Sequence, residues 1–385
     1  MAMRLSRSIV GEAEAAAVSR VIIEDGYLGM GNETHRFEED LCAYLGVEAW
    51  QVVTVNSGTA ALHLACDAIR GTDWDNTPRA AQGAKPEILV PSLTFVASFQ
   101  AIAAAGCVPV ACDVLAETGT LDLDDAARRI TPNTLAVMFV DYASNPWHLD
   151  EVYAFAKSHG LRVVEDAAHA FGCLHHGRKI GSFGDMVCFS FDGIKNITCG
   201  EGGCLVAFDR AGAQLASDAR LLSVAKDAEK RFAGTRSWDP DVTRQGWRYH
   251  LSNIMAAVGR VQLSRLEGEF IPKRRELAAI YREELAGNPD IALFATDPDD
   301  FVVPHILPVR ILHGKNAAAK AALEKEGIPT GMHYKPNHLL TFFKSPAPLP
   351  VSEQLFGELC TLPLHPGLSC DEVRTVCRAL KQALA

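Results

Sequence analysis

Two segments of the chain contain residue types that could carry out amine chemistry. Residues 188–203 hold one lysine, Lys195, between an apolar run and a glycine-rich run, and about thirty residues upstream the apolar run 161–164 leads into Asp166. An amine that can form a Schiff base and a carboxylate that can face a pyridinium nitrogen are the two protein groups that pyridoxal phosphate (PLP) chemistry needs. The two segments together therefore indicate a PLP site.

Taken by itself, Lys195 has two interpretations. Its surroundings are typical of a strand (186–191), a loop and a second strand (204–208), so Lys195 could simply be exposed in a glycine-rich hairpin. Most lysines are solvated surface charges. If Lys195 is instead buried beside a cation or an apolar wall, its pKa falls and the neutral amine becomes a nucleophile.

Asp166 also has two interpretations. It precedes a possible helix and could cap it. However, the run before it is typical of a buried strand, and ligands bind at the carboxyl ends of strands in open α/β sheets. A carboxylate there would keep a pyridine nitrogen protonated, so that the ring can accept electrons. His169 follows closely and could donate to the phenolic oxygen of the cofactor or to Asp166, or it could be purely structural.

A phosphate site is predicted upstream of these segments. Ser57, Gly58 and Thr59 lie between an apolar strand, 51–55, and a helical pattern. Hydroxyls and backbone N–H groups at a helix N-terminus bind anions, although the same residues also make ordinary helix caps. Ser190, close to Lys195 in sequence, could add another hydroxyl to the same phosphate.

Five segments of the chain resemble the DegT/DnrJ/StrS family of PLP-dependent sugar aminotransferases, within fold type I of the aspartate aminotransferase superfamily. Their order and spacing agree with the family from roughly residue 8 to residue 285, and more loosely to the end. No single motif is decisive, but this many in register make coincidence very improbable. The matching segments are 26–31 with Phe37 and Glu38, then 57–62, 91–97, 165–170 and 189–203.

The resemblance implies roles for individual residues. Lys195 matches the lysine that holds PLP as a Schiff base and then moves the proton between substrate and cofactor. Asp166 matches the partner of the pyridine nitrogen, and Phe95 matches an aromatic residue that stacks on the ring, which suits a flat, electron-poor ring. The implied phosphate contacts are Gly58, Thr59 and Ser190.

Three positions depart from the family pattern. His169 stands where the family commonly has Gln, which can make the same donation. Arg248 replaces an Asn that reaches across the dimer to the partner's PLP phosphate, and guanidinium binds phosphate well. His250 replaces an Arg, which puts recognition of the substrate or amino-donor carboxylate in doubt. Some family members have His in place of the lysine and dehydrate sugars, so Lys195 favours transamination.

A further segment, 331–336, resembles the part of the family that helps to line the substrate pocket. It contains His333, Tyr334 and Lys335, and we expect these three side chains to contact substrate. The alternative is a strand and loop that end at Pro336.

The alternation of strand-like and helical segments predicts an α/β fold with a mostly parallel mixed sheet flanked by helices. We expect a large PLP-binding domain, 1–262, and a small C-terminal α+β domain, 263–385, joined by a long helical stretch at 252–285. Two polar stretches, 72–86 and 226–241, are predicted to be loops. The helices and strands expected are 12–24, 34–45, 51–55, 59–69, 88–90, 97–105, 109–113, 123–129, 134–140, 150–159, 161–165, 306–311, 316–326 and 371–384.

Composition excludes several classes of protein. The 385 residues include 37 basic and 47 acidic side chains, a net charge of −10 without a basic block, which disfavours nucleic acid and anionic membranes as partners. No apolar run is long enough for a membrane span, and no signal peptide is recognisable. The 11 cysteines are scattered without a CxxC pair, so we expect reduced thiols, no metal site and a cytoplasmic protein. His175 and His176 are expected in a surface turn.

These observations predict a PLP-dependent aminotransferase that moves an amino group from an amino acid, glutamate by family resemblance, to a keto sugar. The resemblance also implies a nucleotide-linked sugar, a homodimer with shared active sites, and a place in the biosynthesis of amino sugars for lipopolysaccharide, other polysaccharides or glycosides. A PLP-dependent sugar dehydratase and a PLP-binding sensor without turnover are the alternatives.

Overall fold

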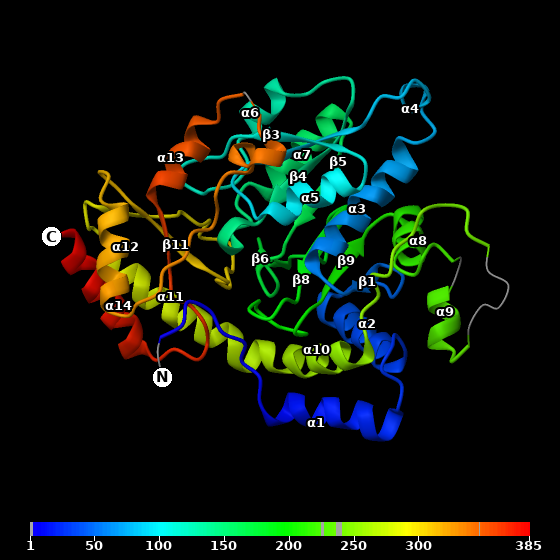
Figure 1. Ribbon diagram of the computed structural model, residues 1–385, viewed down its shortest axis with the longest axis horizontal. Coiled ribbons are helices and arrows are strands. Elements are labelled where there is room, and N and C mark those ends of the chain that lie inside the picture. Colours follow the sequence, from blue (N-terminus) through cyan, green and yellow to red (C-terminus); the bar gives the residue numbers. More distant parts are fainter. Residues whose placement is uncertain (1–2, 225–226, 236–240, 346) are drawn as a thin grey trace.

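A seven-stranded sheet forms the centre of the computed structural model, which describes residues 3–224, 227–235, 241–345 and 347–385 (Figure 1). The strand order is β1-β9-β8-β5-β4-β2-β3, and β9 alone runs antiparallel to its neighbours in this sheet. The sheet is therefore mostly parallel, as predicted. Its strands are β1 (Val52–Val55), β2 (Glu87–Pro91), β3 (Val108–Cys112), β4 (Thr134–Val140), β5 (Arg162–Asp166), β8 (Met186–Ser190) and β9 (Gly203–Ala207).

Helices cover both faces of this sheet. Consecutive strand residues alternate between two hydrophobic cores, as a sheet buried on both sides requires. In β5, for example, Val163 faces one core and Val164 the other. One face is covered by α3 (Gly58–Asp73), α5 (Val96–Ala104) and α8 (Arg210–Ala219), and the other by α2 (Asn32–Leu45), α6 (Leu123–Arg128), α7 (Leu149–His159) and α10 (Asn253–Arg265).

The C-terminal part builds a second core around a three-stranded antiparallel sheet (Figure 1). A helical stretch leads into it, because α10 continues through a π-helical turn, Leu266–Phe270, into α11 (Ile271–Leu285), as the pattern at 252–285 predicts. The domain boundary at residue 262 stays a prediction. The elements of this part are β10 (Ile291–Leu293), β11 (Leu307–Ile311), β12 (Leu359–Leu362), α12 (Asn316–Lys325) and α14 (Cys370–Leu384).

The first helix lies on the outside of the molecule. The predicted helix 12–24 is present as α1 (Glu12–Arg20) and a π-helical turn, Val21–Asp25, which pack on α10 (Figure 1). On the opposite side, Val10, Ile22 and Ile23 are exposed to solvent. This helix therefore has an apolar side that no other described segment of the chain covers.

Two loop predictions were wrong in part. The stretch 72–86 contains α4 (Pro78–Ala81), which Thr77 caps by accepting from the Ala80 N–H at 3.2 Å. The stretch 226–241 contains α9 (Asp227–Phe232), while residues 226 and 236–240 lie outside the described part. Both helices are shorter than two turns, so the sequence shows no periodic apolar stripe that would indicate them. Six further α-helices and β-strands were not predicted: β6 (Leu174–His175), β7 (Arg178–Lys179), α8, β10, β12 and α13 (Pro350–Glu358).

The other helices and strands predicted from the sequence are confirmed, with ends shifted by a few residues. No helix in the described ranges is both long and apolar enough to cross a membrane.

Candidate active site

A cavity of about 340 Å³ opens at the carboxyl ends of the parallel strands. Asp166 ends β5, Ser190 ends β8, and Ser57 follows β1, so one edge of the sheet brings together segments far apart in sequence. Ten of the thirteen predicted site residues line this cavity: Ser57, Gly58, Thr59, Phe95, Asp166, His169, Ser190, Lys195, His333 and Tyr334.

Asp166 is held as a buried hydrogen-bond acceptor. Its Oδ2 accepts from Ser98 Oγ at 2.8 Å, and its Oδ1 accepts from the Ala168 N–H at 3.3 Å. Burial raises the pKa of Asp166, whereas these two donors and the charge of Lys195 oppose that rise. The helix-cap interpretation does not describe it, because Asp166 lies at a strand end inside the cavity and α-helix does not follow it.

The side chain of Lys195 is only partly exposed and lines the same cavity, which excludes the exposed-hairpin interpretation. Burial lowers the pKa of Lys195 to about 8, against the opposing charges of Asp166 and Asp192, and the guanidinium of Arg274 lowers it further. Arg274 Nη2 also donates to the Lys195 carbonyl oxygen at 3.4 Å. A substantial fraction of this amine is therefore neutral near physiological pH.

This pKa gives a testable pH dependence. Because only the neutral amine attacks an aldehyde, the rate at which the apoprotein captures PLP should rise roughly tenfold per pH unit below pH 8 and level off above it. Stopped-flow absorbance after mixing apoprotein with PLP measures this rate. A small alkyl amine of ordinary pKa is the control, and its rate should keep rising to pH 10. If the protein behaves like the alkyl amine, Lys195 is not in the environment described here.

Three imidazoles and a phenol also line the cavity, those of His169, His305, His333 and Tyr334. His169 Nε2 lies 3.1 Å from Tyr334 Oη, and the His169 and His305 rings are 4.7 Å apart. Burial, together with the charge of Lys195, lowers the pKa values of these two histidines well below the ordinary value and that of His333 to about 4. His169 Nδ1 has no hydrogen-bond partner within the described residues, although it is buried. A ligand atom in the cavity could pair with it.

The predicted phosphate cradle is closely packed. Ser57 caps α3 by accepting from the Ala60 N–H at 3.1 Å. A Cβ on Gly58 would lie 2.7 Å from Ser190 Cβ, so only glycine lets the helix N-terminus and the end of β8 approach this closely. Backbone N–H groups and hydroxyls thus converge at a helix N-terminus, where an anion is stabilised.

Gly58→Ala should therefore weaken PLP binding by tenfold or more and lower the melting temperature, because the cradle must widen. Spectrophotometric PLP titration and thermal unfolding measure the two effects. Gly357→Ala is the matched control, since a Cβ at Gly357 in α13 meets nothing within 4 Å. Equal PLP affinity in the two variants would show that the approach of Gly58 to Ser190 is not needed for binding.

Three predicted site residues do not line the cavity of their own chain. Arg248 and Lys335 are exposed, and His250 is half-buried beside the end of β1, where it bridges to Val55. For Arg248 this placement agrees with the expectation that it serves the partner's site. The roles of all three stay predictions.

Other residues of the site were not predicted from the sequence. Ser98 lies on α5 and donates to Asp166, and Thr94 Oγ1 is 2.9 Å from Ser98 Oγ. His305, Asp192 and Glu201 line the cavity. Spacing could have indicated Ser98, because it follows Phe95 by about one helical turn. His305 could have been indicated by its position directly before the predicted strand 306–311.

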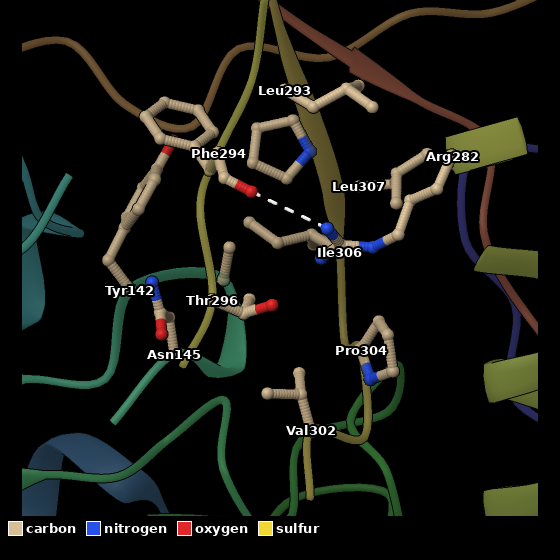
Figure 2. Close-up of a pocket in the computed structure, with 12 residues that line it drawn as sticks. Tyr142, Asn145, Arg282, Leu293, Phe294, Thr296, Val302, Pro304, Ile306 and Leu307 are labelled. Carbon is tan, nitrogen blue, oxygen red and sulfur yellow. Dashed lines mark hydrogen bonds between the residues drawn. The ribbon is translucent and has the colours of Figure 1, made fainter. Parts of the chain in front are cut away.

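A second, smaller cavity lies between the two sheets. It has a volume of about 30 Å³, enough for about one water molecule, and is therefore too small for a sugar or a cofactor. Figure 2 shows Arg282 pointing across it to the carbonyl oxygen of Phe294, to which Nη1 donates at 3.5 Å. This cavity belongs to the packing between the two parts of the chain.

Comparison with known proteins identifies the family. The model of the DegT/DnrJ/EryC1/StrS aminotransferase family matches residues 9–381. The chain belongs to this family. It is similar to a dTDP-4-dehydro-2,3,6-trideoxy-D-glucose 4-aminotransferase from Saccharopolyspora spinosa, at 35% identity over 392 aligned residues, covering 99% of this chain and 97% of the relative.

Solved structures agree with this assignment. The aminotransferase TlmJ from Streptoalloteichus hindustanus is 31% identical and superimposes with a TM-score of 0.89, covering 100% of this chain and 99% of that one. The protein Spr1654 from Streptococcus pneumoniae, whose PMP form is 26% identical with a TM-score of 0.86 over 99% of this chain and 98% of that one, has also been solved in a PLP form. The protein is thus a PLP-dependent sugar aminotransferase of fold type I, as the sequence predicted.

The cavity fits this cofactor. It offers a glycine-lined helix N-terminus for the phosphate, a buried carboxylate in Asp166, and an unpartnered nitrogen in His169. Lys195 supplies an amine of lowered pKa in the same cavity.

Proposed function

We propose that this aminotransferase moves an amino group from glutamate to the 4-keto group of a dTDP-linked deoxy sugar. The observation that carries the proposal is that Lys195, Asp166 and the residues proposed to bind a phosphate, Gly58 and Ser190 among them, all line one cavity. The Saccharopolyspora spinosa relative, named as a 4-aminotransferase for a dTDP-linked sugar, supports the substrate class.

Each part of the cavity would have its own role in holding PLP. Gly58, Thr59 and the hydroxyls of Ser57 and Ser190 would bind its phosphate. Asp166 would face the ring nitrogen, His169 would donate to the phenolic oxygen, and Phe95, an exposed residue of the cavity lining, would stack on the ring. When bound, PLP supplies an electron sink for charge that develops on the substrate carbon.

Lys195 would move the proton in both halves of the reaction. Its lowered pKa lets the amine take a proton from the donor carbon and return one to the cofactor side. Asp166 would stay ionised beside it, because Ser98 and Ala168 donate to its carboxylate. The neutral imidazoles of His169 and His305 would keep the cavity wall free of competing positive charge.

Substrate contacts are proposed for the segment that forms the far wall. His333 Nδ1 lies 2.8 Å from Thr361 Oγ1, which fixes the ring so that its other edge faces the cavity. Tyr334 packs between His169 and Phe95, with ring centroids 5.6 Å from Phe95. We propose that both contact the sugar, and that Lys335 and His250 contact its anionic groups from the rim or from a partner subunit.

A homodimer would complete the site. Among the residues that line the cavity, Lys195 is the one Lys or Arg, whereas the donor carries two carboxylates and PLP a phosphate. An apolar groove of about 670 Å³, lined by Val10, Ile22 and Ile23, is bordered by residues 198–200 of the Lys195 loop. A second copy seated there would bring its own side chains next to this loop, and Arg248 is the exposed cation proposed to cross.

This arrangement predicts complementation between inactive variants. Lys195→Ala and Arg248→Ala chains, each nearly inactive alone, should regain up to about half of the wild-type activity per active site in mixed dimers. Differently tagged chains that are co-expressed and purified in two steps supply the mixed dimers. No recovery in verified mixed dimers would mean that Arg248 serves its own subunit.

We further propose a cytoplasmic enzyme that supplies amino sugars for glycosides or for a surface polysaccharide such as lipopolysaccharide. All 11 cysteines are free and ten of them are buried, which suits a reducing compartment. A net charge of −10 gives nucleic acids and anionic lipids no attraction.

The substrate proposal is tested with the PMP form of the enzyme. Mixed with a dTDP-linked 4-keto-6-deoxy sugar, it should form the dTDP-linked 4-amino sugar and return to the PLP form, as followed by mass spectrometry and absorbance. The same sugar without the nucleotide is the control and should react at least tenfold more slowly. Equal rates with both sugars would contradict recognition of the nucleotide.

A further inference from the structure

A group of potential metal ligands lies outside the active site, where the β6–β7 hairpin meets the start of α7. The ligand atoms of Asp150, His175 and His176 all lie within 4.8 Å of one another. His175 ends β6, and His176 with Gly177 forms the turn into β7. The expected surface turn is therefore present, but the prediction that both histidines are surface residues was wrong, because His175 is only 3% exposed.

His175 presents one ring nitrogen without a hydrogen-bond partner. Its Nδ1 lies 2.8 Å from Oδ1 of the buried Asp300, which fixes the ring. Nε2 is buried, makes no hydrogen bond, and lies 3.5 Å from Asp150 Oδ2. A carboxylate on one histidine nitrogen commonly orients the other nitrogen toward a metal ion.

His176 has a similar arrangement on the surface side. Its Nδ1 lies 3.4 Å from the same oxygen, Asp150 Oδ2, and its Nε2 lies 3.6 Å from Asp297 Oδ2. One ring nitrogen of His175 thus faces Asp300, and one ring nitrogen of His176 faces Asp297. The other nitrogen of each ring approaches Asp150. Hydrogen bonds do not account for the approach of both imidazoles to Asp150. The distances from His175 Nε2 and His176 Nδ1 to Asp150 Oδ2, 3.5 Å and 3.4 Å, are longer than those of ordinary hydrogen bonds.

We propose that Asp150, His175 and His176 bind one Zn²⁺ ion, with water as the fourth ligand. Tetrahedral zinc with ligands at about 2.0–2.2 Å separates neighbouring ligand atoms by about 3.3–3.6 Å, and the two distances to Asp150 Oδ2 agree with this spacing. Imidazole nitrogens with one carboxylate suit zinc, whereas Mg²⁺ and Ca²⁺ need oxygen ligands.

One adjustment is required for all three ligands to converge. The two imidazole rings are stacked, with centroids 4.0 Å apart and planes 25° apart, so their lone pairs run side by side. The side chain of His176 is 46% exposed and can turn without disturbing the core, whereas His175 is already fixed by Asp300. The site would therefore form on zinc binding by rotation of His176.

The proposed ion would act as a structural link. Leu174 of β6 exchanges two backbone hydrogen bonds of 2.9 Å with Phe301, so the hairpin holds the segment from Asp297 to His305. None of the three ligands lines the active-site cavity, but His305 at the end of this segment does. Zinc would fasten α7, the hairpin and this segment to one another.

The alternative to a zinc ion is a protonated His175 that forms ion pairs with the surrounding carboxylates. Burial alone would lower the pKa of His175, but Asp300 and Asp150 outweigh it and raise the pKa, so a protonated ring would also be stabilised. A purely ionic network of this kind would not respond to zinc, and this difference makes the two interpretations distinguishable.

The test uses the PLP-loaded enzyme, freed of metal with a chelator and then dialysed against chelator-free buffer at pH 8. Calorimetric titration with zinc sulfate should give one ion per chain and raise the melting temperature by several degrees, while magnesium chloride should do neither. His176→Gln and Asp150→Asn alter exposed side chains, so they should fold normally and weaken zinc binding at least roughly tenfold. His313→Gln, an exposed histidine 3.0 Å from Asp290, is the matched control and should bind zinc like the wild type.

Cobalt substitution identifies the ligand types. Co²⁺ bound at this site should show the visible bands of a tetrahedral nitrogen and oxygen site without the near-ultraviolet bands of cobalt thiolate. Thiolate bands would assign the metal to cysteines and overturn the proposal. Zinc binding that is absent, or unchanged in both His176→Gln and Asp150→Asn, would overturn it as well.

Discussion

Lys195→Ala should lower the rate of transamination by roughly 10³-fold or more, because the variant loses both the amine that anchors PLP and the base that moves the proton. Lys195 lines the same cavity as Asp166 with its pKa lowered to about 8, and it is the one lysine among the described residues that line this cavity. An exposed lysine nearby could not substitute for Lys195, because moving its charged amine out of water into the cavity would cost hydration free energy.

Steady-state kinetics with saturating keto sugar, and the absorbance of the protein-bound cofactor, measure the effect. Lys157→Ala, in which an exposed lysine of α7 is removed, is the matched control and should keep the wild-type rate. The Lys195→Ala protein should still fold, because alanine in this position leaves Asp166 bonded to Ser98 and Ala168. A Lys195→Ala variant that retained even a tenth of the rate would remove Lys195 from the proton transfer.

Asp166→Asn should lower turnover roughly 10²–10³-fold while leaving PLP bound. The change keeps the shape of the side chain but removes the negative charge that would stabilise a protonated ring nitrogen, and such a preorganised charge acts strongly in a buried site. The phosphate cradle at Gly58 and Ser190 does not involve Asp166, so cofactor affinity should change much less than the rate.

The variant Ser98→Ala is compared with Asp166→Asn and should have the smaller effect on the rate. It removes one donor to the carboxylate, and a hydrogen bond to a charged group contributes about 1.5–3 kcal/mol, so the loss of rate should be smaller than for Asp166→Asn. Rates and PLP affinities of both variants are measured side by side. If Asp166→Asn loses cofactor and rate in proportion, Asp166 acts in binding alone and not in the chemistry.

The sequence predicted the centre of the site because its residues sit at strand ends. The apolar run before Asp166 and the one before Ser190 show where parallel strands stop, and carboxyl ends of parallel strands meet at one edge. The fold class followed from the same alternation of strands and helices. Family resemblance added Phe95 and the wall of His333 and Tyr334, which no local pattern indicated.

What the sequence did not predict depends on contacts between distant segments. Ser98 donates to a carboxylate 68 residues away, and His305 meets His169 after the segment that follows β10 has bridged back to Leu174 through Phe301. The buried state of His175 is due to Asp300, 125 residues further along the chain. A local pattern such as His175-His176-Gly177 predicts the turn but cannot predict which partner lies beneath it.

The half-reaction with glutamate tests the central claim most directly. Holding enzyme in the PLP form and adding glutamate without keto sugar should convert the cofactor to PMP and release one 2-oxoglutarate per active site, as absorbance and an enzymatic assay for 2-oxoglutarate measure. Lys195→Ala should show neither change. Wild-type protein that binds PLP but leaves its spectrum and the glutamate unchanged, with other amino acids equally inert, would contradict the account and indicate a PLP-binding protein without transaminase activity.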